Sequence, residues 1–188
     1  MKFEILKVLK NNFSKIYESN IDEINYQIER YKKLLENFES TYGNKENISI
    51  ISTPGRTELS GNHTDHNGGK VIAASINLDT VIAFAKSENI ISIKSDKYDE
   101  IFKVDLKNLF PHENEIGTTN SLIRGIATEF VNRGFKIGGF NSVLTSNVLQ
   151  GSGLSSSASI EVAIGSVLNF LYNNNEIPAH VIAQIGQF

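Results

Sequence analysis

A polar, glycine-rich segment lies between two apolar runs in the first half of the chain, and it restricts the possible folds more than any other stretch. Residues 52–77 read S-T-P-G-R-T-E-L-S-G-N-H-T-D-H-N-G-G-K-V-I-A-A-S-I-N. The β-branched run 48–51 precedes this segment, and the apolar run 71–74 follows its polar part. Clustered glycine lets a backbone turn sharply and approach a ligand closely. We therefore expect a polar binding site between two strands.

A plainer interpretation is that these side chains only satisfy the backbone of their own turn. Two observations favour a binding site instead. Arg, His and Asp offer hydrogen-bonding groups of three different geometries at fixed spacing. If the first strand continues into the segment, Arg56 and Glu58 lie on one face of it and can form an ion pair.

The segment resembles the galactokinase signature of the GHMP small-molecule kinases, G-R-V-N-L-I-G-E-H-T-D-Y-N-G-G. From residue 55 this chain reads G-R-T-E-L-S-G-N-H-T-D-H-N-G-G, which agrees at ten of the fifteen positions. The resemblance implies that Arg56 stabilises charge on a transferred phosphoryl group. It also implies that signature side chains bind sugar hydroxyls, namely Asn62, His63, Thr64, Asp65 and, as a further candidate, Glu58.

Two departures from the family pattern bear on the identity of the sugar. Glu58 and Asn62 stand where the family has Asn and Glu, respectively. An amide both donates and accepts hydrogen bonds, whereas a carboxylate only accepts them. A site built for one pattern of hydroxyl groups discriminates against another. Glu58 either supplies the lost carboxylate or only pairs with Arg56, and we hypothesise a shifted preference among galactose-like hexoses.

A second segment with chemical character occupies residues 150–159, which read Q-G-S-G-L-S-S-S-A-S and precede an apolar helical pattern. The start of a helix leaves about four backbone N–H groups without partners and carries partial positive charge, so it can bind a phosphate. The segment is not a Walker loop, because the Gly-Lys-Ser/Thr ending is missing. For such a loop considered alone, simple serine capping is the favoured interpretation.

The position of this loop after the first segment favours phosphate binding over simple serine capping. The GHMP kinases share a second motif, P-x-G-x-G-L-S-S-S-A, which wraps the phosphates of ATP. This chain matches it from Gly151 onward and has Leu149 in place of the proline. The resemblance implies that Ser157 reaches Mg²⁺. It further implies a set of nucleotide-binding residues, namely Gly151, Ser152, Gly153, Leu154, Ser155, Ser156, Ser157 and, by a loose correspondence, Ser95.

Periodicity predicts the remaining elements. Apolar residues at helical spacing predict helices over 2–18, 24–38, 120–132, 160–171 and 178–188. Asn20 with Glu23 has the form of a capping box before the second of these helices, and Gly43 ends it. Short β-branched runs predict strands over 48–51, 80–85, 90–94, 97–104 and 140–145. Because short turns join the strands between residues 80 and 104, we expect them to pair as an antiparallel meander.

These signals and the resemblance together imply an α+β fold, with a mixed sheet and helices on one face as in GHMP kinase N-terminal domains. We expect residues 1–45 to form a helical N-terminal extension that serves packing or oligomerisation. Residues 46–188 then form the GHMP N-terminal domain, incomplete at its C-terminal end. Family members continue with a Mg²⁺-binding Glu, the catalytic Asp and a C-terminal domain, so we expect this 188-residue chain to be inactive.

Composition excludes several other classes of protein. The net charge of −3 provides no basic footprint for nucleic acid, and no apolar run approaches the roughly 18 residues that span a bilayer. The chain has no cysteine, so it has neither disulfides nor a thiolate nucleophile. The charged, mixed N-terminus is not a signal peptide. A cytoplasmic protein is the simplest interpretation.

The resemblance implies ATP-dependent phosphorylation, with Mg²⁺, of the anomeric hydroxyl of galactose or a related hexose. Two alternatives belong to other classes. A non-catalytic sensor of sugar and ATP would share the fold, although the intact Ser-Ser-Ser-Ala stretch argues against it. A truncated domain that mainly self-associates through its helical extension is the other. The sequence leaves the oligomeric state open.

Overall fold

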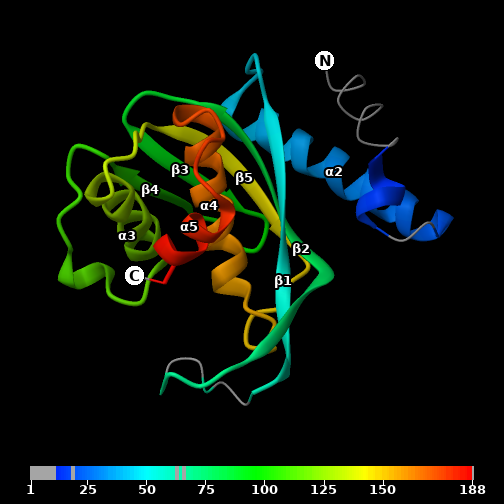
Figure 1. The fold of residues 1–188 in the computed structure, drawn as a ribbon. Coiled ribbons are helices and arrows are strands. Elements are labelled where there is room, and N and C mark those ends of the chain that lie inside the picture. Colours follow the sequence, from blue (N-terminus) through cyan, green and yellow to red (C-terminus); the bar gives the residue numbers. More distant parts are fainter. Residues whose placement is uncertain (1–11, 18–19, 62–63, 65–66, 188) are drawn as a thin grey trace.

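The computed structural model describes residues 12–17, 20–61, 64 and 67–187. Its centre is a five-stranded mixed sheet with the strand order β1-β2-β5-β3-β4 (Figure 1). The strands are β1 (Ser49–Ser60), β2 (Ile72–Lys86), β3 (Ile90–Ser95), β4 (Ile101–Asp105) and β5 (Phe140–Ser146). The mixed sheet and the α+β class confirm the fold predicted from the sequence.

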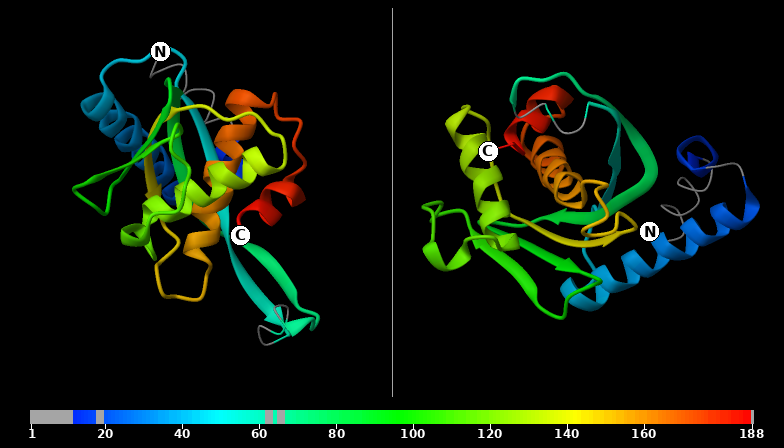
Figure 2. Two further views of the ribbon diagram at one scale, coloured as in Figure 1. Left: turned by 90° about the vertical axis from the view of Figure 1, so that its left-hand side faces the viewer. Right: turned by 90° about the horizontal axis from the view of Figure 1, so that it is seen from below.

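Helices cover both faces of this sheet (Figure 2). They are α2 (Ile21–Tyr42), α3 (Thr119–Asn132), α4 (Ser156–Tyr172) and α5 (Ala179–Ile185), with a short 3-10 helix, η2 (Glu113–Glu115). The helices α3, α4 and α5 pack on one face, and α2 packs on the other. None of the helices in the part of the chain described above combines the length and apolar character that a bilayer crossing requires.

The alternation of side chains along β2 explains how one strand serves two cores. Ile82 and Phe84 point to the face that α3 and α4 cover, and they are fully buried there. Val81 and Ala83 point to the opposite face and pack with α2. Successive side chains of a strand point to opposite faces, so an uninterrupted apolar run requires cover on both sides. The N-terminal helix supplies that cover on the second face.

The helix α2 begins after the predicted cap at Asn20 and ends at the predicted Gly43, so it extends beyond the apolar positions 24–38 at both ends. The side chain of Asn20 accepts a hydrogen bond of 2.8 Å from the amide of Asp22, which caps the helix. Gly43 ends it with a φ of 76°. Leu35 and Phe38 are buried against the sheet. The predicted extension therefore shares a core with the sheet, while its division from the domain at residue 45 stays a prediction.

The expected meander is wrong in one pairing. β3 and β4 pair antiparallel as predicted, but β2 and β3 do not pair with each other. β5 lies between them, antiparallel to β2 and parallel to β3. The connection crosses the end of β5, where the Ser87 amide bonds to the Gly139 carbonyl at 2.9 Å. β5 buries Phe140 and Leu144 on one face and Val143 on the other, so burying it as the central strand outweighs the short turn that predicted a hairpin.

The polar signature segment is mostly strand rather than loop. β1 continues to Ser60 and β2 begins at Ile72, so the two strands form a long ribbon that projects from the body of the molecule (Figure 2). Two register shifts interrupt the ribbon, one between Pro54 and Arg56 and the other between Glu58 and Ser60. Such irregularities bend a strand and redirect its side chains. In the sequence, the residues predicted to bind sugar at positions 62–65 follow the end of β1.

A core substitution in α2 tests whether this helix belongs to the same cooperative unit as the sheet. Leu35 is 1% exposed in the core that α2 forms with the sheet. We expect Leu35→Ala to lower the free energy of unfolding by about 2–5 kcal/mol. Ile21→Ala in the same helix, where the side chain is 65% exposed, should change it by less than about 0.5 kcal/mol. Equal, small losses in urea denaturation would show that α2 unfolds separately from the sheet.

Candidate functional site

The two polar segments predicted from the sequence touch each other directly. The amide of Arg56 in β1 donates a hydrogen bond of 3.0 Å to the carbonyl of Leu154 in the loop that precedes α4. Gly55 permits this approach, because a Cβ atom at that position would lie 2.9 Å from the Leu154 oxygen and 3.1 Å from the methyl groups of Val148. The signature strand and the glycine-serine loop are therefore packed backbone to backbone.

A cavity of about 310 Å³ lies along this contact. One wall comes from β1 and β2, and the other comes from the start of α4. The cavity is lined by Pro54, Gly55, Arg56, Ala73, Ala74, Ser75, Ser155, Ala158, Ser159 and Val162. Arg56 of the first motif and Ser155 of the second thus share one cleft.

Arg56 and Glu58 form the ion pair that their spacing on a strand predicts. Arg56 Nη1 lies 3.8 Å from Glu58 Oε2, and the two side chains are 42% and 12% exposed. A pair this long and partly solvated contributes little to stability, so it leaves the guanidinium able to contact a ligand. The sequence left two roles open for Glu58, a sugar-binding carboxylate or a partner of Arg56, and the structure has the pairing with Arg56.

The backbone of the glycine-serine loop is shaped to present N–H groups. Gly151, Gly153 and Ser155 all have positive φ, at 75°, 75° and 62°, and the residues between them do not. Alternation of this kind turns successive amides into one concavity that suits an anion. Ser155 precedes the first residue of α4 but makes no side-chain capping bond. Simple serine capping is therefore wrong for this loop, and the left-handed Ser155 is strained without that compensation.

The start of α4 faces a second cavity, of about 430 Å³, on its other side. Ser157 and Glu161, one helical turn apart, line it together with Thr118 and Ser121 near the start of α3. Within the described ranges the Glu161 carboxylate has no hydrogen bond or ion pair. Burial raises its pKa. A serine hydroxyl and an unpaired carboxylate are the hard oxygen donors that Mg²⁺ prefers.

Sequence reasoning missed Glu161. It lies within an apolar helical pattern and stands outside both motifs, so no local feature marks it. The available signal was its spacing of four residues from Ser157, which places both side chains on one face of a helix. In the part of the chain that the structure describes, no three His, Asp or Glu side chains gather into a metal site.

The sugar-binding residues predicted from positions 62–65 of the signature belong to the segment that joins β1 to β2 in the sequence. Asn62, His63 and Asp65 fall outside the described residues, and their roles stay predictions. Thr64 is described, and its hydroxyl donates a hydrogen bond of 2.8 Å to the carbonyl of Gly61. The side chain of Thr64 thus bonds back to the residue that follows β1.

Two of the predicted nucleotide-binding serines use their hydroxyls locally. The Ser152 hydroxyl donates to the Leu149 carbonyl at 2.6 Å. Ser95 is buried at the end of β3, where its hydroxyl accepts a hydrogen bond of 3.2 Å from the Lys97 amide. Ser95 lines neither of the two cavities beside α4, and its role stays a prediction.

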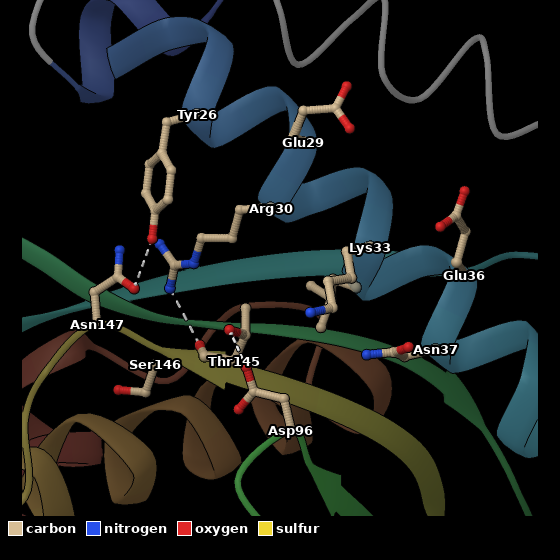
Figure 3. Close-up of a pocket in the computed structure, with 11 residues that line it drawn as sticks. Tyr26, Glu29, Arg30, Lys33, Glu36, Asn37, Asp96, Thr145, Ser146 and Asn147 are labelled. Carbon is tan, nitrogen blue, oxygen red and sulfur yellow. Dashed lines mark hydrogen bonds between the residues drawn. The ribbon is translucent and has the colours of Figure 1, made fainter. Parts of the chain in front are cut away.

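A larger cavity, of about 600 Å³, lies on the opposite face of the sheet, between α2 and the ends of β3 and β5 (Figure 3). Its lining includes Tyr26, Arg30 and Lys33 of α2 and Thr145 of β5, and none of the residues predicted from the two motifs. We place the candidate site in the smaller cleft, because both motifs meet there and the backbone conformation of the loop suits an anion.

Two family models match the chain in the order of the two motifs. Residues 36–86 match the galactokinase galactose-binding signature, and residues 121–188 match the N-terminal domain of GHMP kinases. The first match includes the whole of β1 and β2, and the second includes the glycine-serine loop and α4.

Solved structures share this fold. Galactokinase from Lactococcus lactis, crystallised with galactose, superimposes with a TM-score of 0.76 and 28% identity over 84% of this chain. Mevalonate kinase from Methanococcus jannaschii has a TM-score of 0.60 and 22% identity over 76% of the chain. Phosphomevalonate kinase from Streptococcus pneumoniae, in complex with phosphomevalonate and AMPPNP, has a TM-score of 0.53 and 21% identity over 73%. The chain spans 41%, 46% and 41% of these three proteins, respectively.

Substitution of Gly55 tests the contact between the two segments. Gly55→Ala places a methyl group against the backbone oxygen of Leu154, which cannot rotate away, so we expect a loss of about 1–3 kcal/mol in unfolding free energy. Gly125→Ala is the matched control, because it lies inside α3 with open space around it and should stabilise the protein by about 0.5–1 kcal/mol. Urea denaturation measures both, and a neutral Gly55→Ala would contradict the close approach.

Proposed function

Because the chain belongs to the GHMP kinases and carries the galactose-binding signature of galactokinases, we propose that it is part of an ATP-dependent sugar kinase. The reaction would move the γ-phosphoryl group of ATP to the anomeric hydroxyl of galactose or a related hexose. The observation that carries the proposal is the hydrogen bond from the Arg56 amide to the Leu154 carbonyl. It joins the signature strand to the glycine-serine loop at a shared cleft.

The two segments supply different parts of such a reaction. Phosphoryl transfer depends mainly on positioning and on stabilising charge on the phosphate oxygens. The amides from Gly151 to Ser157 would hold nucleotide phosphates, since alternating backbone conformations point them into one concavity. The half-exposed guanidinium of Arg56 would stabilise charge on the transferred group from the opposite wall. Asn62, His63, Thr64 and Asp65 would bind the sugar.

The donor atoms around Ser157 fit a magnesium ion. Ser157 would hold it, and Glu161 would be a further ligand besides the Glu that the resemblance places beyond Phe188. Ser157 and Glu161 line one cavity, and the Glu161 carboxylate is without a partner among the described residues. When bound, Mg²⁺ would neutralise charge on the nucleotide phosphates. The resemblance places the catalytic Asp beyond Phe188, and we propose that the 188-residue chain alone does not turn over substrate.

The shared cleft is also compatible with the alternative of a non-catalytic sensor. A sensor of sugar and ATP would bind the same two ligands without phosphoryl transfer, so release of ADP by a form that contains the catalytic Asp separates kinase from sensor. The shift in hexose preference expected from Asn62 and Glu58 remains part of the proposal. The cytoplasmic location expected from the composition also remains part of the proposal.

Nucleotide binding to the 188-residue chain tests the proposal, with AMPPNP and Mg²⁺ as the probe in calorimetric titration. Gly153 has a φ of 75° and open space around it, so Gly153→Ala disturbs only the backbone conformation of the loop. We expect this variant to lose about 1–2 kcal/mol in stability and to bind AMPPNP at least ~10-fold more weakly.

Gly134→Ala is its matched control. Gly134 has a φ of 79° and open space around it, but it follows α3, outside both motifs and both cavities beside α4. The control should lose similar stability and keep the affinity of the parent chain. Absence of nucleotide binding in the parent chain, or equal binding by the two variants, would contradict the proposed site.

The pH dependence of stability tests the environment of Glu161. Burial raises its pKa, so the folded state favours the protonated carboxyl. The stability that this group contributes is present below its unfolded pKa of ~4.3 and is lost as pH rises through the folded value. We expect Glu161→Gln to stabilise the protein more at about pH 8 than at about pH 4. Urea denaturation of both proteins at the two pH values measures the difference.

The same variant tests the proposed metal ligand. Addition of Mg²⁺ with AMPPNP should stabilise the parent chain more than Glu161→Gln, because only the parent has a carboxylate for the ion. Equal stabilisation of the two proteins would remove Glu161 from the metal site. An unchanged pH dependence would show that its carboxyl is solvated.

A further inference from the structure

A buried charged cluster lies under α2, on the sheet face opposite the cleft. It consists of Tyr17, Arg30, Ser52 and Asp79, and we call it the Asp79 cluster. Asp79 is 3% exposed and its carboxylate accepts three hydrogen bonds. Arg30 Nη1 donates to Oδ1 at 2.5 Å, and the hydroxyls of Tyr17 and Ser52 donate to Oδ2 at 2.6 and 2.5 Å. The carboxylate is thus held from three separate elements of the chain.

Stability alone does not account for this cluster. The cost of burying two charges is seldom exceeded by their attraction, and well-packed apolar residues of similar volume often stabilise a protein equally well. The surrounding core consists largely of such residues, since Leu34, Leu35 and Phe38 of α2 belong to it. What a hydrogen-bonded carboxylate adds is orientation, because each donor must approach along a defined direction.

The Asp79 cluster contacts the signature strand, β1, next to a register shift. Asp79 in β2 lies opposite Pro54 of β1, and the register shift begins immediately after that pair and ends at Arg56. A register shift redirects the side chains that follow it. Ser52, two residues before Pro54, bonds directly to the Asp79 carboxylate. The carboxylate therefore holds β1 just before the irregularity that sets the direction of Arg56.

The Asp79 cluster also contacts the end of β5, from which the glycine-serine loop begins. The Asp79 carbonyl accepts a hydrogen bond of 3.0 Å from the amide of Asn147, the first residue after β5. Arg30 Nη2 donates to the same carbonyl at 3.0 Å and to the Thr145 carbonyl at 3.2 Å. Figure 3 shows Arg30 reaching from α2 to the end of β5, beside Tyr26, whose hydroxyl bonds to Asn147 Oδ1 at 3.2 Å.

We propose that Asp79 is a positioning residue of the kinase site, and that α2 and the segment around Tyr17 support the site through it. One side of Asp79 holds the strand that carries Arg56, and the other holds the residue from which the phosphate-binding loop departs. The relative position of the two segments is then set from the face of the sheet opposite the cleft. This inference rests on the proposed function, and it gives the N-terminal helical region a role in the site.

Ser52→Ala tests the proposal with a small change in volume. It removes one donor to Asp79 and leaves the buried Arg30–Asp79 ion pair intact. We expect the Arg56 amide, which bonds to Leu154, to exchange its hydrogen about tenfold faster, and the affinity for AMPPNP with Mg²⁺ to fall by about threefold or more. Ser52→Thr restores a hydroxyl and should restore both values. Tyr17→Phe, which removes a second donor, should act in the same direction as Ser52→Ala.

Tyr42→Phe is the matched control. The Tyr42 hydroxyl joins the end of α2 to Ser92 of β3 at 3.0 Å, far along the sheet from Asp79. The substitution removes one partly buried hydroxyl contact between α2 and the sheet, so it reports the purely structural effect of such a loss. We expect it to leave the exchange of the Arg56 amide and the nucleotide affinity unchanged.

The outcomes separate the two proposals. If Ser52→Ala and Tyr17→Phe lower global stability but leave the exchange of the Arg56 amide at the level of Tyr42→Phe, Asp79 is only a structural residue. If the parent chain binds no nucleotide while Ser52→Ala still accelerates exchange at Arg56, the positioning role stands and the proposed function fails. Exchange at one amide thus decides the inference independently of ligand binding.

Discussion

One backbone hydrogen bond, from the amide of Arg56 to the carbonyl of Leu154, joins the two polar segments of this protein. It forms only because Gly55 has no side chain where the loop passes β1. Everything proposed about the site depends on this approach, because the signature strand and the glycine-serine loop are about ninety residues apart in the sequence. Without this contact, the two segments would not be joined at one site.

The sheet makes this contact possible by placing β1 and β5 on either side of β2. The loop leaves the end of β5, one strand away from β1, and therefore crosses β2 near Asp79. Cover on both faces keeps this arrangement rigid, with α4 above the sheet and α2 below it. The helices that bear no motif residue are consequently part of the framework that holds the motifs.

Local features of the sequence predicted much of the fold. The helical spacing of apolar residues located α2, α3 and α4, and β-branched runs located β3 and β5, since such patterns depend on which faces are buried. The glycine pattern from Gly151 to Gly153 predicted a loop with exposed amides, and the structure adds a left-handed Ser155. Local sequence patterns did not predict which strands pair in the sheet. The turn at 87–89 predicted a hairpin, and only the burial of β5 on both faces explains why another strand lies between.

The sequence by itself determined the chemistry of the two segments, because residue types and their spacing set which donors, acceptors and backbone conformations are available. It also determined the pairing of Arg56 with Glu58, since side chains two residues apart share a strand face. Only the tertiary structure decided that the segments share a cleft, that Glu161 joins Ser157 at one cavity, and that Asp79 holds both segments from behind. These relations join residues far apart in the chain, and such contacts follow from how the whole sheet packs rather than from any local pattern.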